Sequence, residues 1–162
     1  MKELLDNRTG KLIEPKTVVS YCRSQNLLVF SFEAYDSSLN SFSNIDNDTI
    51  YKGDVVEVFL DLGEEHYYEF EVAPNGTVFV AKIVNFTPVF IPRDFFKSHV
   101  EIKGNNYFVE MIIDLSVFEN TQNIKFNAFR IETKGIKSDY ILQALSPTLS
   151  NSFHVRDRFI KL

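Results

Sequence analysis

The chain has 162 residues, of which 44% are hydrophobic and 24% charged, and its formal net charge at pH 7 is −5. This length supports one domain with a real core (residues 1–162), and the composition excludes a wholly disordered chain. The acidic charge disfavours a nucleic-acid partner, because binding one needs a basic surface that neutralises phosphates. No apolar stretch approaches the roughly 18–20 residues that cross a bilayer, so no membrane partner is expected.

The N-terminal stretch Met1–Leu12 (MKELLDNRTGKL) lacks the apolar centre of a secretory signal peptide. We therefore expect a cytoplasmic protein if the chain is full length, and an excised module of a secreted protein otherwise. Cys22 is the only cysteine, which excludes an internal disulfide and a cysteine zinc site.

Strand-like patterns dominate the first half of the chain. The β-branched and aromatic runs Thr17–Arg23 and Leu27–Tyr35 flank a turn-forming Ser-Gln-Asn and predict a hairpin. After the polar loop Asp36–Thr49, strands are expected at Asp54–Asp61 (DVVEVFLD) and His66–Val72 (HYYEFEV). A Pro-Asn-Gly turn then leads into a further strand, TVFVAKIV, because Asn and Gly tolerate a positive φ.

The second half continues in the same manner, with short strands separated by turn signals. Helical turns are expected only at Ile91–Asp94 and, at most, at Leu115–Glu119. The remaining predicted elements are a hairpin of Val100–Lys103 with Tyr107–Asp114, a long strand at Ile124–Thr133 and an ordered loop at Ser146–Ile160. These patterns predict an all-β fold, a two-sheet antiparallel sandwich of the jelly-roll or immunoglobulin-like type with one or two helical turns.

Four acidic side chains are candidates for a polar site. Because strand side chains alternate, Glu57 and Asp61 share one face of their strand, and Glu69 and Glu71 share one face of the next. This group has three interpretations: a solvated polar face, a set of hydrogen-bond acceptors for sugar hydroxyls, or a glycosidase pair. The last would use Glu57 with Glu69 or Glu71 across a cleft of roughly 5–10 Å.

Arg130 lies in the middle of the predicted strand IKFNAFRIET, where an arginine is costly to bury unless it is paired. We expect an ion pair with one of the four strand carboxylates; direct contact with a ligand's hydroxyls is the alternative. The loop that precedes the DVVEVFLD strand offers hard oxygen ligands at Asp36, Asp46 and Asp48. These three residues make calcium a candidate cofactor, although the spacing of the aspartates is not that of an EF-hand.

Three segments, in order, carry a resemblance to a known family. They are Asp54–Asp61 (DVVEVFLD), Tyr67–Gly76 (YYEFEVAPNG) and Ser146–Leu162 (SPTLSNSFHVRDRFIKL). Together they resemble carbohydrate-binding module family 9 and its stand-alone relatives. The resemblance extends over nearly the whole chain and implies a β-sandwich that binds sugars without cleaving them.

The resemblance also implies which residues form the sugar site. Tyr51 and Phe153 match the two aromatic positions that hold the ligand, and removing both rings is expected to abolish binding without unfolding the protein. Glu57, Asn151 and His154 match polar positions beside them. The full candidate set is Tyr51, Glu57, Glu69, Glu71, Arg130, Asn151, Phe153 and His154.

The chain departs from the family pattern at several positions. The xylanase-linked modules have tryptophan at both aromatic positions, whereas this chain has no tryptophan. Glu71 stands where those modules have an arginine on the second strand, and Arg156 stands where many relatives have a proline. These departures bear on which sugar is bound.

We therefore predict a non-catalytic domain whose partner is a mono- or oligosaccharide. Two other classes remain open. One is the small glycoside hydrolase described above. The other is a redox module of related fold, in which Met111 and one of His66, His99 or His154 would bind haem.

Overall fold

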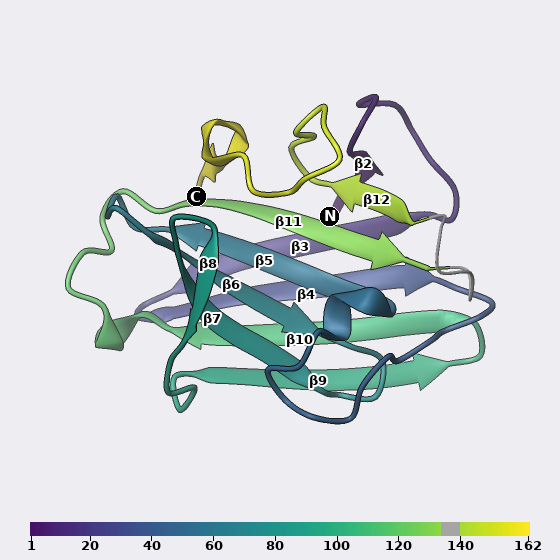
Figure 1. Cartoon of the computed structure of the whole chain (residues 1–162), viewed down its shortest axis with the longest axis horizontal. Helices are drawn as coiled ribbons and strands as arrows, with labels where there is room; N and C mark the ends of the chain where they lie inside the picture. Colours follow the sequence, from purple (N-terminus) through teal and green to yellow (C-terminus); the bar gives the residue numbers. More distant parts are fainter. Residues whose placement is uncertain (134–139) are drawn as a thin grey trace.

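Two antiparallel β-sheets pack against each other in the computed structural model, which describes residues 1–133 and 140–162 (Figure 1). Every strand pairing among these residues is antiparallel. The predicted two-sheet antiparallel sandwich is therefore confirmed. Within the described part of the chain, no helix is long and apolar enough to cross a bilayer.

The smaller sheet has five strands in the order β1-β3-β4-β10-β9. The predicted hairpins β3–β4 and β9–β10 lie side by side, because β4 pairs with β10 along its whole length. Its strands are β1 (Lys2–Glu3), β3 (Thr17–Ser24), β4 (Leu27–Tyr35), β9 (Phe96–Lys103) and β10 (Asn106–Asp114).

The larger sheet has eight strands in the order β2-β12-β11-β5-β6-β7-β8, with β13 also paired to β11. The antiparallel neighbours β5, β6 and β7 follow one another along the chain, whereas β11 reaches β5 from far along the sequence. Its strands are β2 (Leu5–Asp6), β5 (Val55–Asp61), β6 (Tyr67–Val72), β7 (Val78–Val84), β8 (Thr87–Phe90), β11 (Lys125–Glu132), β12 (Ile141–Ala144) and β13 (Ile160–Lys161).

Helical structure in the described residues is limited to three 3-10 turns: η1 (Ile50–Lys52), η2 (Leu115–Val117) and η3 (Arg156–Arg158). The expected turn after Asp114 is η2. The helical turn expected at Ile91–Asp94 is wrong, because the chain is extended there and closes only one turn, where Phe96 N–H donates to the Arg93 carbonyl (2.9 Å). The short strands β8 and β12 were not predicted.

Aromatic and aliphatic side chains fill the space between the two sheets. Alternation sends Val56, Val58 and Leu60 of β5 inward, where they meet Phe30 and Phe126 in one continuous apolar cluster. The Phe30 and Phe126 rings lie 5.2 Å apart between centroids. Burying such rings is the main favourable contribution to folding.

A second apolar cluster covers the outer face of the larger sheet. Phe59, Tyr67 and Phe129 project outward from β5, β6 and β11, and the C-terminal segment places Phe153 and Phe159 on top of them. β5, β6 and nearly all of β11 are therefore buried along both faces. A strand with both faces buried reads as a nearly continuous apolar run, in which any polar residue stands out.

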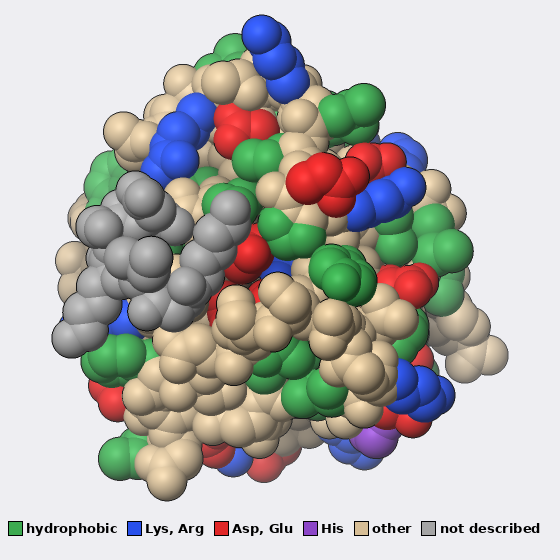
Figure 2. All heavy atoms as spheres, turned by 90° about the vertical axis from the view of Figure 1, so that its right-hand side faces the viewer, with side chains coloured by type: hydrophobic (Ala, Val, Ile, Leu, Met, Phe, Trp, Pro, Cys, Tyr) green, Lys and Arg blue, Asp and Glu red, His purple; other side chains and the backbone are tan. Residues whose placement is uncertain are grey.

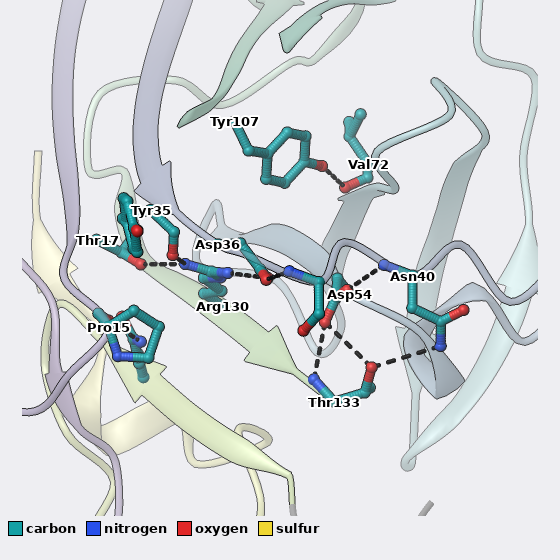
Figure 3. Close-up of polar contacts among 12 residues, drawn as sticks. Pro15, Thr17, Tyr35, Asp36, Asn40, Asp54, Val72, Tyr107, Arg130 and Thr133 are labelled. Atoms are coloured by element: carbon teal, nitrogen blue, oxygen red, sulfur yellow. Dashed lines mark hydrogen bonds and ion pairs between the residues drawn. The ribbon is translucent and has the colours of Figure 1, made fainter. Parts of the chain in front are cut away.

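Arg130 is completely buried at one end of the sandwich interior. Its guanidinium donates to Asp36 Oδ2 (2.6 Å), Thr17 Oγ1 (3.0 Å) and the Tyr35 carbonyl (3.1 Å), as Figure 3 shows. The expected buried ion pair is present, but its predicted partner is wrong. Arg130 is opposite Val56 in the register, so it points inward, away from the outer-face glutamates.

A buried carboxylate, Asp54, completes the polar network at this end. It accepts hydrogen bonds from Asn40 N–H (2.5 Å) and from both the backbone N–H (2.7 Å) and the hydroxyl (3.1 Å) of Thr133. Burial raises the pKa of the Asp54 carboxyl. Figure 2 looks onto the end of the molecule where β4 and β11 finish and shows acidic and basic side chains at the bottom of a hollow there.

We predict that Asp36→Asn destabilises the fold by about 3–5 kcal/mol, because it leaves the Arg130 guanidinium buried without its counter-charge. Urea denaturation measures the loss. Glu110→Gln, at an exposed position of β10, is the matched control and should change the unfolding free energy by less than about 0.5 kcal/mol. Equal effects of the two substitutions would contradict a structural role for the ion pair.

Candidate functional site

A cavity of about 330 Å³ opens on the outer face of the larger sheet. This volume is within the range of small-molecule sites, ~300–1,000 Å³. The strands β5, β6, β7, β11 and β12 form its floor, and η1, the β7–β8 turn and the C-terminal segment form its walls. Its lining residues are Tyr51, Glu57, Phe59, Glu69, Glu71, Phe79, Ile83, Phe86, Pro88, Ile131, Leu142, Asn151, Ser152, Phe153 and His154.

Three glutamates meet in the floor of this cavity. Glu57 of β5 lies opposite Glu71 of β6 in the register, and Glu69 follows on the same face of β6. Each offers a carboxylate oxygen within 4.8 Å of the others, and all three side chains are buried. The predicted sharing of one face is therefore confirmed for these three residues.

The fourth acidic residue of the predicted group, Asp61, does not join them. It is held in a two-pronged ion pair by Arg156, whose Nη2 and Nε donate to its carboxylate oxygens (2.8 and 3.2 Å). Arg156 also donates to the Glu64 and Glu65 carbonyls (2.8 and 3.1 Å). This contact attaches the C-terminal segment to the far end of β5.

Burial of the glutamate triad favours the uncharged form of its carboxyl groups. Burial, and then the negative charge of Glu69, raise the pKa of Glu57 well above its usual range. Burial raises the pKa of Glu69 to about 7, although a hydrogen bond with Glu71 opposes the shift. Burial and both neighbouring carboxylates raise the pKa of Glu71 well above its usual range.

One carboxylate oxygen of Glu71 is buried without a hydrogen-bond partner among the described residues. This atom is Oε2, and the Glu71 side chain is 1% exposed. An unpartnered buried polar atom is costly, and its presence in a native fold asks for an explanation. This oxygen belongs to a residue that lines the cavity, although the oxygen itself is buried.

The two aromatic residues predicted from the resemblance have different environments. Tyr51, in η1, is 43% exposed and forms part of the wall. Phe153 is only 6% exposed and stacks on Phe129, with ring centroids 4.2 Å apart and planes 18° from parallel. Phe153 is therefore a component of the outer apolar cluster that also borders the cavity.

Phe86 is an exposed aromatic residue that sequence reasoning missed. It lies in the β7–β8 turn, lines the cavity and is 77% exposed. Asn85 (φ +47°) and Phe86 (φ +62°) both adopt the left-handed conformation typical of a tight hairpin turn. Asn85 is a residue type that favours such a turn and could have indicated it from the sequence. Phe86 hides the turn, because a phenylalanine seldom adopts a positive φ.

The C-terminal segment brings two further predicted residues to the cavity. The Nδ1 atom of His154 and the hydroxyl of Tyr67 form a hydrogen bond (2.5 Å). Burial lowers the pKa of His154. Asn151 is exposed, and its side-chain oxygen accepts a hydrogen bond from Arg8 Nε (2.6 Å). The structure thus assembles every predicted site residue except Arg130 around one cavity.

The calcium ligands predicted in the Asp-rich loop do not come together. Asp36 is paired with Arg130, Asp46 with Arg93 (2.6 Å), and Asp48 accepts a hydrogen bond from Thr49 N–H (2.7 Å). Among residues 1–133 and 140–162, the glutamate triad is the one group of three possible metal ligands. A shared calcium site at Asp36, Asp46 and Asp48 is therefore wrong for this geometry.

The haem alternative fails on the position of Met111. This side chain is completely buried between the sheets, and its register partner on β9 is Ser98. His99 pairs with Glu110 and therefore faces the opposite side of the smaller sheet. His66 is bonded to Glu64 and Tyr68, and His154 lies at the outer cavity, so Met111 is a core residue.

Comparison with known proteins identifies the fold. No protein-family model matches the chain. A protein of the fungus Arthroderma benhamiae described as "Extracellular protein" is 28% identical over 173 residues, which cover 91% of this chain and 78% of that protein. A solved structure of a proposed carbohydrate-binding protein from Bacteroides uniformis superposes with a TM-score of 0.83 at 17% identity, covering 99% of this chain and 84% of that one.

Two solved family 9 carbohydrate-binding modules from Caldicellulosiruptor kristjanssonii are also similar. The complex with glucose has a TM-score of 0.72 and 19% identity, covering 99% of this chain and 82% of the module. The complex with cellotriose has a TM-score of 0.59 and 21% identity, covering 79% of this chain and 64% of that one. The chain therefore has the fold of these modules, as the sequence resemblance implied.

We predict that the stability of the protein falls as the pH rises from about 5 to 8. Unfolded glutamates titrate near ~4.3, whereas burial raises the pKa of all three cavity glutamates. In this window the folded protein holds more protons than the unfolded chain, so the free energy of unfolding decreases with pH. Urea denaturation at several pH values measures the free energy of unfolding. This free energy should fall less steeply with pH in the double variant Glu57→Gln/Glu71→Gln than in the unchanged protein. Identical slopes would show that the glutamates do not titrate abnormally.

Phe153→Ala should destabilise the protein by about 3–5 kcal/mol, since it empties a buried position in the outer apolar cluster. The resemblance implied that the Tyr51 and Phe153 rings can both be removed without unfolding the protein, and the burial of Phe153 argues against this for its ring. Thermal unfolding measures the loss, with Phe153→Leu as the conservative control that retains most of the volume. An unchanged melting temperature for Phe153→Ala would mean that its ring is dispensable for packing.

Proposed function

We propose that this chain is a non-catalytic carbohydrate-binding domain and that the sugar occupies the cavity on the outer face of the larger sheet. The observation that carries this proposal is the combination, in one preformed cavity, of buried carboxyl groups with aromatic walls. Similarity to modules solved with glucose and cellotriose supports it.

A sugar ring has polar edges and apolar faces, and the cavity matches both. Tyr51 and Phe86 are the exposed rings available to cover the apolar C–H faces of the ligand. Glu57, Glu69 and Glu71 line the floor, where a protonated carboxyl donates to a sugar oxygen and an ionised one accepts from a hydroxyl. Asn151 and His154 add polar groups at the rim.

The affinity of such a site is expected to be modest. The cavity is open on one side, so a small polar ligand gains little apolar burial after its own desolvation and immobilisation. Dissociation constants on the order of micromolar to millimolar follow for a mono- or short oligosaccharide.

The geometry favours binding over glycoside hydrolysis. Catalytic carboxyl groups flank the scissile bond at separations of roughly 5–5.5 Å or 6.5–9.5 Å. Here the three carboxyl groups lie side by side in the floor of the cavity and do not face one another across a cleft. Assays with aryl-glycosides should show no turnover; turnover that is lost in Glu57→Gln would establish an enzyme instead.

Tyr51→Ala and Phe86→Ala should each weaken sugar binding about tenfold, because each removes a ring contact worth ~1.5 kcal/mol. Both side chains are exposed, so neither substitution should lower the melting temperature appreciably. Calorimetric titration with glucose, cellotriose and xylo-, manno- and galacto-oligosaccharides measures the effect. Ile102→Ala, an exposed apolar residue of the smaller sheet, is the control. Unchanged affinity in the Tyr51→Ala/Phe86→Ala double variant would rule out this site.

A further inference from the structure

The cavity concentrates acidic side chains, and no lysine or arginine lies among its described lining residues. Three of its lining residues are glutamates. Arg130 points to the opposite face of the sheet, and Arg156 is occupied by Asp61. A buried acidic group without a counter-charge is unfavourable, and proteins normally satisfy it with a proton, a pairing cation or a ligand.

One buried carboxylate oxygen beside the cavity lacks a hydrogen-bond partner among the residues that the structure describes. Glu71 supplies this atom, Oε2, and its buried side chain lines the cavity. Its register neighbour Glu57 and its strand neighbour Glu69 each bring an oxygen into the same small volume. Three oxygens arranged this way match a group that carries three N–H donors and a positive charge.

We propose that the ligand of this site is an amino sugar whose ammonium group lies among Glu57, Glu69 and Glu71. The inference rests on the proposed carbohydrate-binding function and specifies its substrate class. The sugar ring would occupy the rest of the cavity against Tyr51 and Phe86, and the ammonium would donate to the three carboxyl groups. One carboxyl proton would pass to the solvent as the ammonium brings its single positive charge, so that the net charge of the cavity stays the same.

The surroundings favour an organic cation over a bare metal ion. Calcium takes six to eight oxygen ligands, whereas the triad consists of three side chains. The cavity of about 330 Å³ is far larger than an ion. Its remaining lining is mostly aromatic and aliphatic, which suits the faces of a sugar ring and the attraction between an ammonium and aromatic rings.

The titratable groups around the proposed ammonium position come from several elements. Glu57 belongs to β5, Glu69 and Glu71 to β6, Tyr51 to η1 and His154 to the C-terminal segment. Burial raises the pKa of the three glutamates and lowers that of His154, so none of these groups brings a stable positive charge to the cavity at neutral pH. The ammonium would then be the only cation in the site.

Calorimetric titration of the intact chain with glucosamine, N-acetylglucosamine and glucose at pH 7 tests the proposal. Glucosamine should bind at least tenfold more tightly than either neutral sugar, because acetylation removes the charge while the ring stays the same. Repeating the titration in two buffers with different heats of ionisation should show protons released on glucosamine binding. Fully deacetylated and fully acetylated chito-oligosaccharides extend the comparison to longer ligands.

Glu71→Gln keeps the size of the side chain and removes its charge, so it should abolish the preference for glucosamine over glucose. Glu110→Gln, which removes an exposed charge on the other sheet, should leave the preference unchanged. Equal affinity for glucosamine and glucose would overturn the amino-sugar proposal and leave the carbohydrate-binding function standing. No binding of any sugar would overturn both. Calcium or manganese binding that is lost in Glu71→Gln would show that the triad is a metal site instead.

Discussion

The central strands of the larger sheet, β5, β6 and β11, are buried on both faces, and most features of this protein depend on that constraint. The inner face of this sheet packs against the smaller sheet, and its outer face carries a second apolar cluster that needs a cover. The chain supplies this cover with its own C-terminal segment. Asn127 fixes the start of the segment by bonding to both the carbonyl and the N–H of Ser146 (2.7 and 3.0 Å). Buried Asn7 holds Thr148 by donating to its hydroxyl (2.8 Å) and accepting from its backbone N–H (2.9 Å).

The candidate site is the part of the outer face that this cover leaves open. Its floor is as deep in the structure as a core position, which explains why burial dominates the pKa values of Glu57 and Glu71. Three buried acids destabilise the fold as the pH rises, and a sheet built for stability alone would place apolar residues at these positions. Acidic groups at such buried positions are typical of sites where stability is given up for function, and Glu71 Oε2 has no hydrogen-bond partner among the described residues.

The strand bounds and strand faces that could be predicted well are those that follow from the local periodicity of the sequence. The alternation of side chains along a strand is a property of the strand alone, so the outward orientation of Glu57, Glu69 and Glu71 followed from the pattern. β4 was predicted with its observed bounds because its apolar residues alternate regularly between two turn signals. The short strand β12 carries no such signal, and it forms only because β11 offers an edge for pairing.

The sequence by itself determined the fold class, the strand faces and the presence of an acidic group between aromatic residues. Only the tertiary structure decided which groups meet. Arg130 pairs with Asp36, 94 positions away, because the register of β11 turns it into the interior. Phe153 is buried because it stacks on Phe129, and Phe86 becomes a wall because the β7–β8 turn lies beside the cavity. Such contacts join distant parts of the chain, and no local pattern encodes them.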